Sequence, residues 1–433
     1  MELMNYSVIQ RDDDGYGRFE YSGKCPDAYD GERIYVRVVR EEDNLIIVEN
    51  ADCTVNENGW HVSLEIPEGG LYRVETIYCC KGSRGTRIEC RFHVGVGDVY
   101  VTAGQSNMSG YGLDTAYDPP QLGVHAYYNR GTWDIAAHPL GCSAGSIYRP
   151  CDGLSETSPA LSFGRFLSNR LHLPIGLVPA AVGSSLLETW KPDEDGTNWN
   201  QVLERLKVVG KVKGIIWSQG CADASERKGT DYYERLASAI AQWREVLGPV
   251  PVLMLQLNRT VNADPELSRH WGMVIDAQRK ASLTIPGVYC VPSYDMTTFD
   301  TIHNASGSNV ILGERLANAA LVGVYGQRGR TAIAFTSCEA IDNTHVKLNI
   351  TQNFTTRLWD NTADGMNVED EDGLIDCIGC CHYGTYLVVT TPRPYKLPAK
   401  FHFSWKTHPP MFVGHESNGQ PFLSCYGLPI EKT

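Results

Sequence analysis

The chain changes character at an apolar run followed by a polar turn, Val99-Tyr100-Val101-Thr102-Ala103-Gly104-Gln105-Ser106-Asn107-Met108. Before this stretch, from Arg33 to Val96, short β-rich bursts are separated by Asn, Gly and Pro residues. After it, apolar runs alternate with longer segments of helical periodicity, which is typical of βαβ units on a parallel sheet. The first part therefore predicts an all-β domain, and the second part predicts an α/β domain.

The α/β part contains five apolar runs that we predict to be strands. These runs are Val99–Ala103, Ile175–Ala181, Gly214–Ser218, Val252–Leu257 and Val288–Val291. Helical patterns lie between and after them, at Pro159–Arg170, Trp199–Val209, Tyr232–Leu247, Trp271–Leu283 and Asn309–Gly323. After about Arg330 this pattern ends, and runs such as Val346–Ile350 and Tyr386–Thr390 predict sandwich strands.

A chain of 433 residues is too long for one ordinary core, since single cores stop growing at about 250 to 300 residues. The length suggests two or three domains, and the changes of pattern along the chain indicate three. Residues 1–96 form an N-terminal β domain, residues 97–328 an α/β domain, and residues 329–433 a C-terminal β-sandwich.

Polar segments follow the predicted strands, at the sheet edge where open α/β sheets bind their ligands. They are Gly104-Gln105-Ser106-Asn107-Met108, Val182-Gly183-Ser184-Ser185, Gln219-Gly220-Cys221-Ala222-Asp223 and Asp300-Thr301-Ile302-His303. Together they supply a hydroxyl nucleophile, a histidine base, a carboxylate and oxyanion donors, which are the groups that acyl transfer requires. Asp300 and His303 are close enough in sequence to approach Ser106 as one unit.

These segments resemble the SGNH-type sialate O-acetylesterases and the related acetyl xylan esterases. The resemblance rests on the Gly-Gln-Ser-Asn-Met segment with the late Asp-x-x-His, and on blocks from Gly176 to Gly183, from Glu188 to Trp190 and from Gly214 to Gly220. Patches in the flanking parts resemble the family as well, at Gly59–Val62, Gly69–Tyr72, Phe403–Trp405 and Gly419–Pro421. The resemblance implies an SGNH-hydrolase fold, with a flavodoxin-like parallel sheet flanked by all-β domains.

The resemblance also implies a role for each site residue. Ser106 is the nucleophile, His303 the general base and Asp300 its partner. The backbone N–H groups of Ser106 and Gly183 and the side chain of Gln219 form the oxyanion hole. The chain departs from the family at Cys221, where relatives commonly have Glu, although Asp223 is kept.

Other interpretations of these residues compete with this one. Gly141-Cys142-Ser143-Ala144-Gly145 fits the nucleophile elbow of α/β-hydrolases, but its surroundings are typical of a loop. The cluster of Cys377, Cys380 and Cys381 could supply zinc thiolates, but it has no matching second half, so we expect no metal and no cofactor. Trp190 and Glu188 could line the pocket, although a Trp near a helix start is more often part of the packing.

The charge and the apolar content exclude two classes of partner. A formal net charge of -13 would repel a phosphate backbone, so we expect no nucleic acid. No apolar run is long enough to span a membrane, and the first residues carry Arg11 and three Asp in place of a signal core. We expect a soluble protein, cytoplasmic in this form and secreted or periplasmic if a signal peptide has been removed.

Sequons at Asn107 and Asn304 lie beside the predicted nucleophile and base, where a glycan would block the site. They favour a bacterial protein over a secreted eukaryotic one. We expect an esterase that removes acetyl groups from a carbohydrate, O-acetylated sialic acid first. Acetylated xylan, a non-sugar ester and a catalytically silent glycan-binding protein are the alternatives. The sequence does not indicate an oligomeric state.

Overall fold

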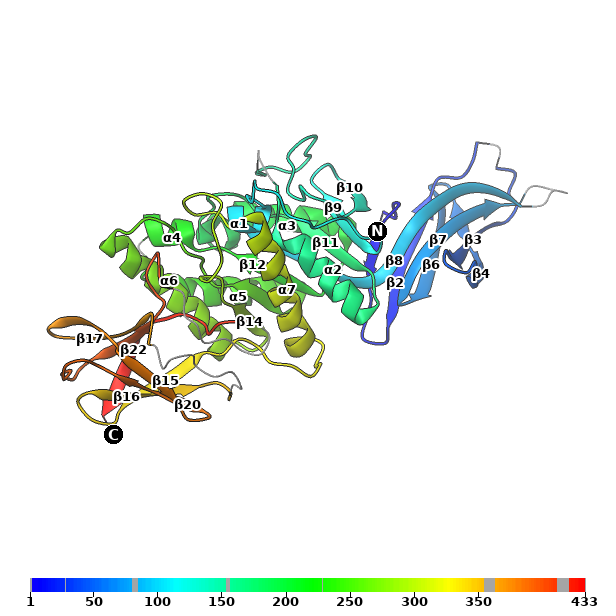
Figure 1. The fold of residues 1–433 in the computed structure, drawn as a ribbon. Coiled ribbons are helices and arrows are strands. Elements are labelled where there is room, and N and C mark those ends of the chain that lie inside the picture. The colour runs from blue at the N-terminus through cyan, green and yellow to red at the C-terminus, as the bar shows by residue number, and fades with distance from the viewer. Residues whose placement is uncertain are drawn as a thin grey trace.

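The computed structural model describes residues 2–27, 29–79, 85–152, 156–227, 229–353, 363–410 and 420–432. The chain forms a β-rich part, a central α/β core and a second β-rich part in sequence order (Figure 1). None of the helices in the described ranges combines the length and the apolar character that a bilayer crossing requires.

The central sheet is parallel except at one edge. Its strands lie in the order β10-β9-β11-β8-β12-β13-β14, and only β10 runs antiparallel to its neighbour. The bounds are β8 (Thr86–Gly104), β9 (Val124–Tyr128), β10 (Thr132–Ile135), β11 (Ile175–Pro179), β12 (Gly214–Ser218), β13 (Val252–Leu255) and β14 (Val288–Val291). The five predicted strands are confirmed, in the flavodoxin-like order with the second strand outside the first. The pair β9 and β10 was not predicted.

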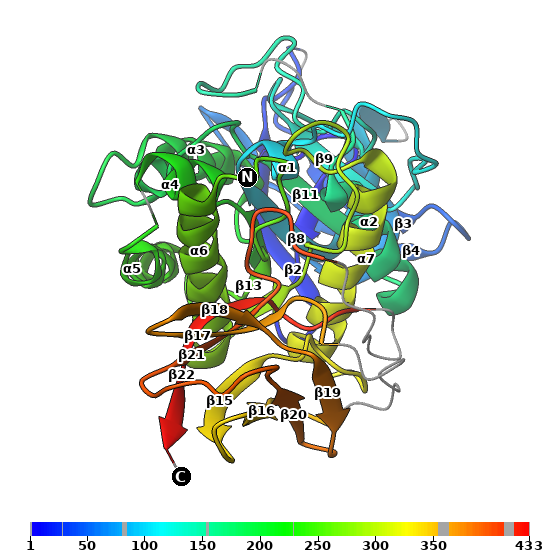
Figure 2. The same cartoon turned by 60° about the vertical axis from the view of Figure 1, so that its left-hand side comes forward.

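Helices cover both faces of this sheet (Figure 2). On one face lie α2 (Pro159–Leu171) and α7 (Ser306–Gly323), and on the other lie α3 (Thr197–Val209), α5 (Tyr232–Leu247) and α6 (Pro265–Thr284). Side chains of β8 alternate between the two cores, because successive residues of a strand point to opposite faces. Val99 and Val101 pack with the Trp residues of α3, α5 and α6, whereas Tyr100 packs with α2 and α7.

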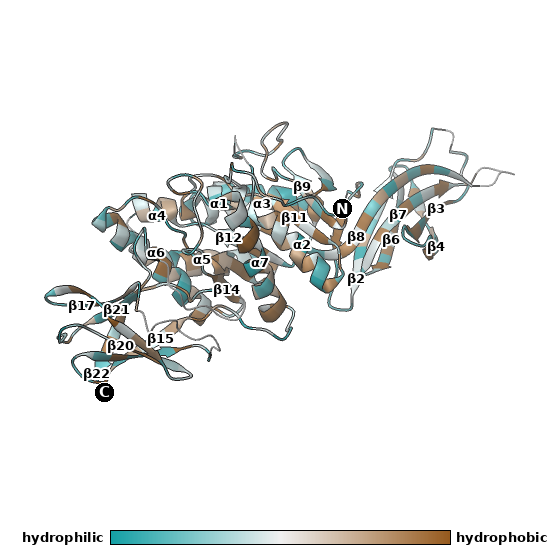
Figure 3. Ribbon diagram, viewed as in Figure 1, coloured by the Kyte–Doolittle hydropathy of each residue, from teal (hydrophilic) through white to brown (hydrophobic). Residues whose placement is uncertain are grey.

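The N-terminal part is joined to the core by a single long strand. The first half of β8 pairs with β1 (Val8–Gln10) and β7 (Gly69–Tyr78), and its second half is the centre of the parallel sheet. The N-terminal half of β8 alternates hydrophobic and hydrophilic residues (Figure 3). The predicted boundary between residues 96 and 97 falls inside this strand, so both parts of the protein share it.

The remaining N-terminal strands lie beside this junction. They are β3 (Ile34–Arg40) and β4 (Ile46–Asp52), which extend the sheet through β7, and β2 (Tyr16–Gly23), β5 (Thr54–Asn56) and β6 (Gly59–Pro67), which form a separate three-stranded sheet. Trp60, Val62 and Leu64 of β6 are buried at alternate positions, as the sequence pattern predicts.

The C-terminal part is one eight-stranded sheet that curls into a half-barrel, so the predicted two-sheet sandwich is corrected. Its order is β18-β17-β21-β22-β15-β16-β20-β19. The bounds are β15 (Phe335–Ala340), β16 (His345–Ile350), β17 (Met366–Asp370), β18 (Gly373–Asp376), β19 (Gly379–His382), β20 (Tyr386–Thr390), β21 (Lys400–Phe403) and β22 (Cys425–Lys432). The alternation of apolar residues shows that one face is buried, but it does not say whether a second sheet or the curl of the same sheet covers that face.

Specific hydrogen bonds hold the C-terminal sheet to the core. The Gln256 amide, at the end of β13, donates to Ser424 O and accepts from Ser424 N, each at 2.9 Å. Thr260 N donates to Thr407 O at 2.7 Å, and the Arg279 guanidinium of α6 donates to Phe335 O at 2.6 Å. The half-barrel is therefore tied to α6 and to the carboxyl end of β13.

Candidate active site

The predicted nucleophile lies at the carboxyl end of β8. Ser106 begins the four-residue helix α1 (Ser106–Ser109) and is largely buried. Gly104, two residues earlier, has φ of +119°, a conformation that side chains other than glycine rarely adopt. A Cβ at this position would meet Ser218 O at 2.1 Å. Glycine thus lets β8 turn sharply beside β12 and present Ser106 at the sheet edge.

Ser106, His303 and Asp300 form a continuous hydrogen-bonded chain. His303 Nε2 lies 2.9 Å from Ser106 Oγ, and His303 Nδ1 lies 2.7 Å from Asp300 Oδ2. Asp300 Oδ1 accepts the N–H groups of Ile302 and His303 at 2.8 and 2.7 Å, which fixes the carboxylate in the turn between β14 and α7. The structure therefore brings the three predicted residues together in the arrangement that activates a serine.

Two asparagines hold the histidine turn against the nucleophile. Asn107, the residue after the serine, accepts Asn304 N at 2.9 Å and donates to Ile302 O at 3.3 Å. Asn258, beyond β13, donates to the same carbonyl at 2.6 Å. Both residues flanking His303 are thus anchored. Asn107 belongs to the predicted segment, but nothing in the sequence indicated Asn258.

An aromatic ring covers the imidazole. Tyr111 stacks on His303 with ring centroids 4.7 Å apart and an interplanar angle of 25°. The ring limits rotation of the imidazole and excludes water from one of its faces. Tyr111 lies two residues after the end of α1 and is therefore close in sequence to Ser106, but a lone Tyr in a loop carries no sequence signal.

The carboxylate partner is held in its ionised form. Partial burial raises the pKa of the Asp300 carboxyl, but hydrogen bonds from His303 and from two backbone N–H groups outweigh that effect. The net pKa of Asp300 lies below its ordinary value. Asp300 is therefore charged at neutral pH and can orient the imidazole and stabilise an imidazolium.

The two predicted backbone donors of the oxyanion hole differ in whether their N–H groups already have an acceptor. Ser106 N–H lies at the first position of α1, where helical N–H groups have no partner within the helix. Gly183 N–H lies in the loop after β11, and it donates to Asp152 Oδ1 at 2.7 Å. The carboxylate of Asp152 thus holds one predicted donor. The sequence did not indicate Asp152.

The Gln219 side chain has other partners. Its Nε2 donates to Ser185 O at 3.0 Å and to Asp223 Oδ2 at 2.6 Å, and its Oε1 accepts the Tyr232 hydroxyl at 2.7 Å. Both amide hydrogens have acceptors in this arrangement, so an oxyanion would compete with Ser185 O and Asp223 Oδ2 for them, and the role that the resemblance implies for Gln219 stays a prediction. The fully buried Asp223 carboxylate needs donors, and Gln219 supplies one of them.

Cys221 has the environment of a packing residue. Burial raises the pKa of its thiol to about 12, and its Sγ lies 3.7 Å from Asn258 Oδ1. A small cavity beside it is lined by polar side chains that include Gln105, Asn107 and Asn304. The thiol remains protonated at neutral pH and does not replace the acid that relatives commonly have at this position.

The competing sequence interpretations find less support in the structure. Ser143 lies in a loop, with neither a strand before it nor a helix after it. Cys380 is buried and Cys381 exposed, as successive residues of β19 point to opposite faces. Within the described ranges, no group of three or more His, Cys, Asp or Glu side chains is arranged to hold a metal ion.

Trp190 and Glu188 do not share one role. Trp190 is fully buried in the core and donates to Ser185 Oγ at 3.0 Å, which supports the packing interpretation. Glu188 lies nearer the surface and pairs with Arg227 at 2.5 Å.

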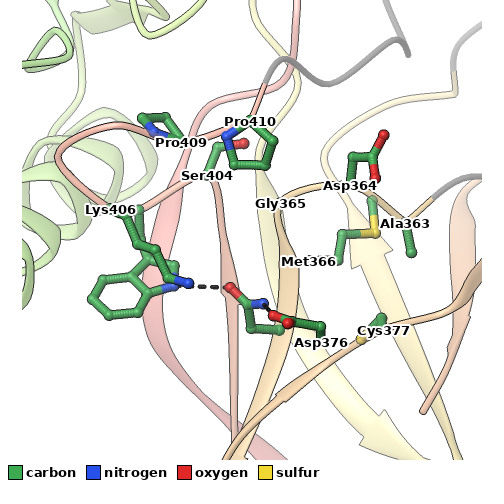
Figure 4. A pocket seen from close by; sticks show the side chains of 12 residues that line it. Ala363, Asp364, Gly365, Met366, Asp376, Cys377, Ser404, Lys406, Pro409 and Pro410 are labelled. Carbon is green, nitrogen blue, oxygen red and sulfur yellow. Dashed lines mark hydrogen bonds between the residues drawn. The ribbon is translucent and has the colours of Figure 1, made fainter. Parts of the chain in front are cut away.

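A separate cavity of about 340 Å³ lies in the C-terminal sheet (Figure 4). Trp405 Nε1 donates to Asn367 Oδ1 at 3.1 Å, and Asn367 Nδ2 donates to Asp376 Oδ1 at 2.6 Å. Trp405 is only 7% exposed, so its ring is not a free platform for a sugar. None of the predicted site residues lines this cavity.

Comparison with known proteins gives a family match over the α/β core. Residues 96–322, more than half of the chain, match the family described as carbohydrate esterase, sialic acid-specific acetylesterase. No protein of curated function matches the sequence significantly.

A solved structure matches the fold of nearly the whole chain. A carbohydrate acetylesterase from Xanthomonas citri is 20% identical, with a TM-score of 0.71 over 98% of this chain and 97% of that chain. A protein from Arabidopsis thaliana is also 20% identical, with a TM-score of 0.44 over 52% of this chain and 97% of that chain. The match to the Xanthomonas structure extends over the α/β core and both β-rich parts, since it covers nearly the whole chain.

Proposed function

Because the chain belongs to the sialic acid-specific acetylesterase family of carbohydrate esterases, we propose that it hydrolyses O-acetyl esters of sialic acid through an acetyl-serine intermediate. Carbohydrate O-acetylesterase activity follows from the family, and the choice of sialic acid and the roles of individual residues are the proposal. The observation that carries it is the hydrogen-bonded chain from Asp300 through His303 to Ser106.

Acylation begins with proton transfer from Ser106 Oγ to His303 Nε2 as the oxygen attacks the acetyl carbonyl. Asp300 holds Nδ1–H, so Nε2 is the free base of the imidazole. The tetrahedral intermediate collapses when the imidazolium gives its proton to the sugar oxygen, and the sugar alcohol leaves. The acetyl group then remains on Ser106.

Deacylation repeats these steps with water as the nucleophile. His303 removes a proton from water, the hydroxide adds to the acetyl-serine, and the proton returns to Ser106 Oγ as acetate leaves. We assign the stabilisation of the negative charge that develops in both steps to the N–H groups of Ser106 and Gly183. Each donor of this kind contributes about 3 kcal/mol to the stability of the transition state.

The direct test is acetate release from a generic acetyl ester by the wild type, Ser106→Ala and Ser143→Ala. We expect Ser106→Ala to lower kcat by about 10⁴-fold or more, and Ser143→Ala to leave it unchanged. Circular dichroism of each variant verifies folding. Full activity of a folded Ser106→Ala variant would refute the assignment of the nucleophile.

A second assay separates the substrates. Acetate release is compared between O-acetylated sialic acid and acetylated xylan at equal concentrations of acetyl groups. We expect the higher kcat/KM with the sialic acid ester. A higher kcat/KM with xylan would favour the alternative of an acetyl xylan esterase, and a wild type that is inert on every acetyl ester would favour a glycan-binding protein.

A further inference from the structure

A carboxylate of the protein itself lies on the Gly183 donor. Asp152 Oδ1 accepts Gly183 N–H at 2.7 Å, and a Cβ built on Gly183 would lie 2.8 Å from the same oxygen. Asp152 is 7% exposed, so the contact is shielded from water. The carboxylate therefore fits closely against the backbone that we propose as part of the oxyanion hole.

The second oxygen of this carboxylate lacks a well-placed hydrogen-bond donor among the described residues. Asp152 Oδ2 is buried and accepts no hydrogen bond of ordinary geometry from the described residues. No Lys or Arg of the described ranges forms an ion pair with Asp152. Burial raises the pKa of its carboxyl, and Ser109, Gly183 N–H and His303 offset only part of that rise. A buried, incompletely solvated carboxylate is costly, and the Gly183 N–H is one of the few donors that offset this cost.

The arrangement resembles the product complex of the proposed reaction. Acetate is a carboxylate, and after deacylation one of its oxygens lies where the oxyanion was. An oxyanion at the Gly183 N–H and the Asp152 carboxylate would place two negative charges at one donor, and such close like charges repel strongly at low dielectric. Before acyl transfer, the Asp152 carboxylate must therefore leave the N–H.

We propose that Asp152 is a built-in occupant of the oxyanion hole, which the acetyl carbonyl of the substrate must displace. This inference rests on the proposed function, because it takes Gly183 N–H as a catalytic donor. A small ester offers few contacts to offset the displacement, whereas a carbohydrate ester can use the binding energy of its sugar. Asp152 is thus a specificity-determining residue that disfavours generic acetyl esters.

The same contact weakens product inhibition. Acetate competes with Asp152 for the Gly183 donor and is repelled by its charge. Removing the carboxylate should free the donor and make the site bind acetate more tightly. Loss of a purely structural contact would not strengthen acetate binding, so this measurement distinguishes the proposed role from a structural one.

The experiment compares the wild type, Asp152→Ala, Asp152→Asn and the control Asp134→Asn. Asp134 is a partly exposed residue of the edge strand β10 that pairs with Arg130, and it has no part in the proposed machinery. Inhibition by sodium acetate is measured with 4-nitrophenyl acetate as substrate. Acetate binding is also titrated by NMR, which does not require turnover.

We expect Asp152→Ala to lower the dissociation constant for acetate by about tenfold and to raise kcat/KM for 4-nitrophenyl acetate by several-fold. Asp152→Asn keeps the shape without the charge and should shift both quantities in the same direction by less. Asp134→Asn should behave as the wild type. If Asp152→Ala does not fold, the isosteric Asn variant decides alone.

Unchanged or weaker acetate binding by the folded Asp152 variants would overturn the proposal, and so would a fall in kcat/KM. Failure of the proposed function looks different. A wild type without esterase activity leaves the NMR titration as the test of Asp152, whereas an active enzyme whose Asp152 variants bind acetate no better refutes only this inference.

Discussion

Single hydrogen bonds decide which serine, histidine and aspartate act together. The sequence contains a second Asp-x-x-His segment, Asp342-Asn343-Thr344-His345, with the same local contacts as Asp300 and His303. His345 Nδ1 lies 2.9 Å from Asp342 Oδ2, and Asp342 Oδ1 accepts His345 N at 2.8 Å. This second pair lies at the start of β16, in the C-terminal sheet, whereas it is His303 Nε2 that lies 2.9 Å from Ser106 Oγ. The local pair is therefore a common turn, and its position beside Ser106 gives it a catalytic role.

The two pairs offer a matched test. Replacing Asp300 by Asn removes the charge that stabilises the imidazolium and favours the wrong tautomer of His303. We expect Asp300→Asn to lower kcat by about 10³-fold or more with little change in KM. Asp342→Asn should leave steady-state kinetics unchanged. Equal activity of Asp300→Asn and the wild type would show that His303 does not need this partner.

At the level of strands and helices, the end of β8 controls the site. Gly104 brings β8 close enough to β12 that a Cβ would overlap Ser218 O, and its φ is positive. Ser106 lies only two residues further on. A substitution that strains the backbone at Gly104 would therefore displace the nucleophile. A glycine at this turn is required by both the backbone angle and the space available.

We therefore expect Gly104→Ala to lower the free energy of unfolding by about 3 kcal/mol or more and to reduce activity. Gly210→Ala is the matched control, because Gly210 also has a positive φ, +89°, but no atom lies within 4 Å of its added Cβ. The control should cost about 1–3 kcal/mol, the strain of the backbone alone, without the added steric overlap. Urea denaturation measures the free energy of unfolding of both variants. Equal losses of stability would refute the steric argument.

At the level of the whole molecule, the half-barrel and the core meet at aromatic residues. Trp405 and Tyr426 pack against Gly272 of α6, where an added Cβ would lie 2.7 Å from the Tyr426 ring. The buried His402 of β21 lies beside both rings, with centroids 5.2 and 4.7 Å away. Its Nδ1 accepts Gly427 N at 3.1 Å, which requires the neutral imidazole.

This histidine makes the contact between the half-barrel and the core sensitive to acid. Burial, together with the positive charges of Lys400, Arg269 and Lys406, lowers the pKa of His402 to about 3. Because the folded pKa lies below the value of about 6.5 in the unfolded chain, the unfolded state binds more protons between these values. Stability is therefore full above pH 6.5 and is lost as the pH falls. At pH 5.0 the loss amounts to about 2 kcal/mol.

The measurement is the difference in Tm between pH 7.5 and 5.0 for the wild type and for His402→Asn, whose amide oxygen can still accept Gly427 N–H. The variant should lose less stability on acidification. An identical pH dependence of the two proteins would exclude His402 as the titrating group.

Much of the fold follows from the sequence, because its signals are local. A buried parallel strand needs a continuous apolar run, and a helix that covers it needs apolar residues three or four apart, so β11, β12, β13 and β14 could be predicted nearly to the residue. Ser106, Asp300 and His303 could be identified for a related reason. The carboxyl ends of parallel strands meet at one edge, so residues after those strands come together.

The remaining features depend on contacts between distant segments. The Gln219 side chain donates to the buried Asp223, and Asp152 accepts the Gly183 N–H. The spacing of these residues in the sequence does not encode either hydrogen bond. The same holds for the half-barrel, since an alternating strand pattern shows that one face is buried but not what buries it. The sequence by itself thus determined the elements and the catalytic residue types. Only the tertiary structure decided which donors are free, because a polar group takes its partner from whatever the fold places beside it.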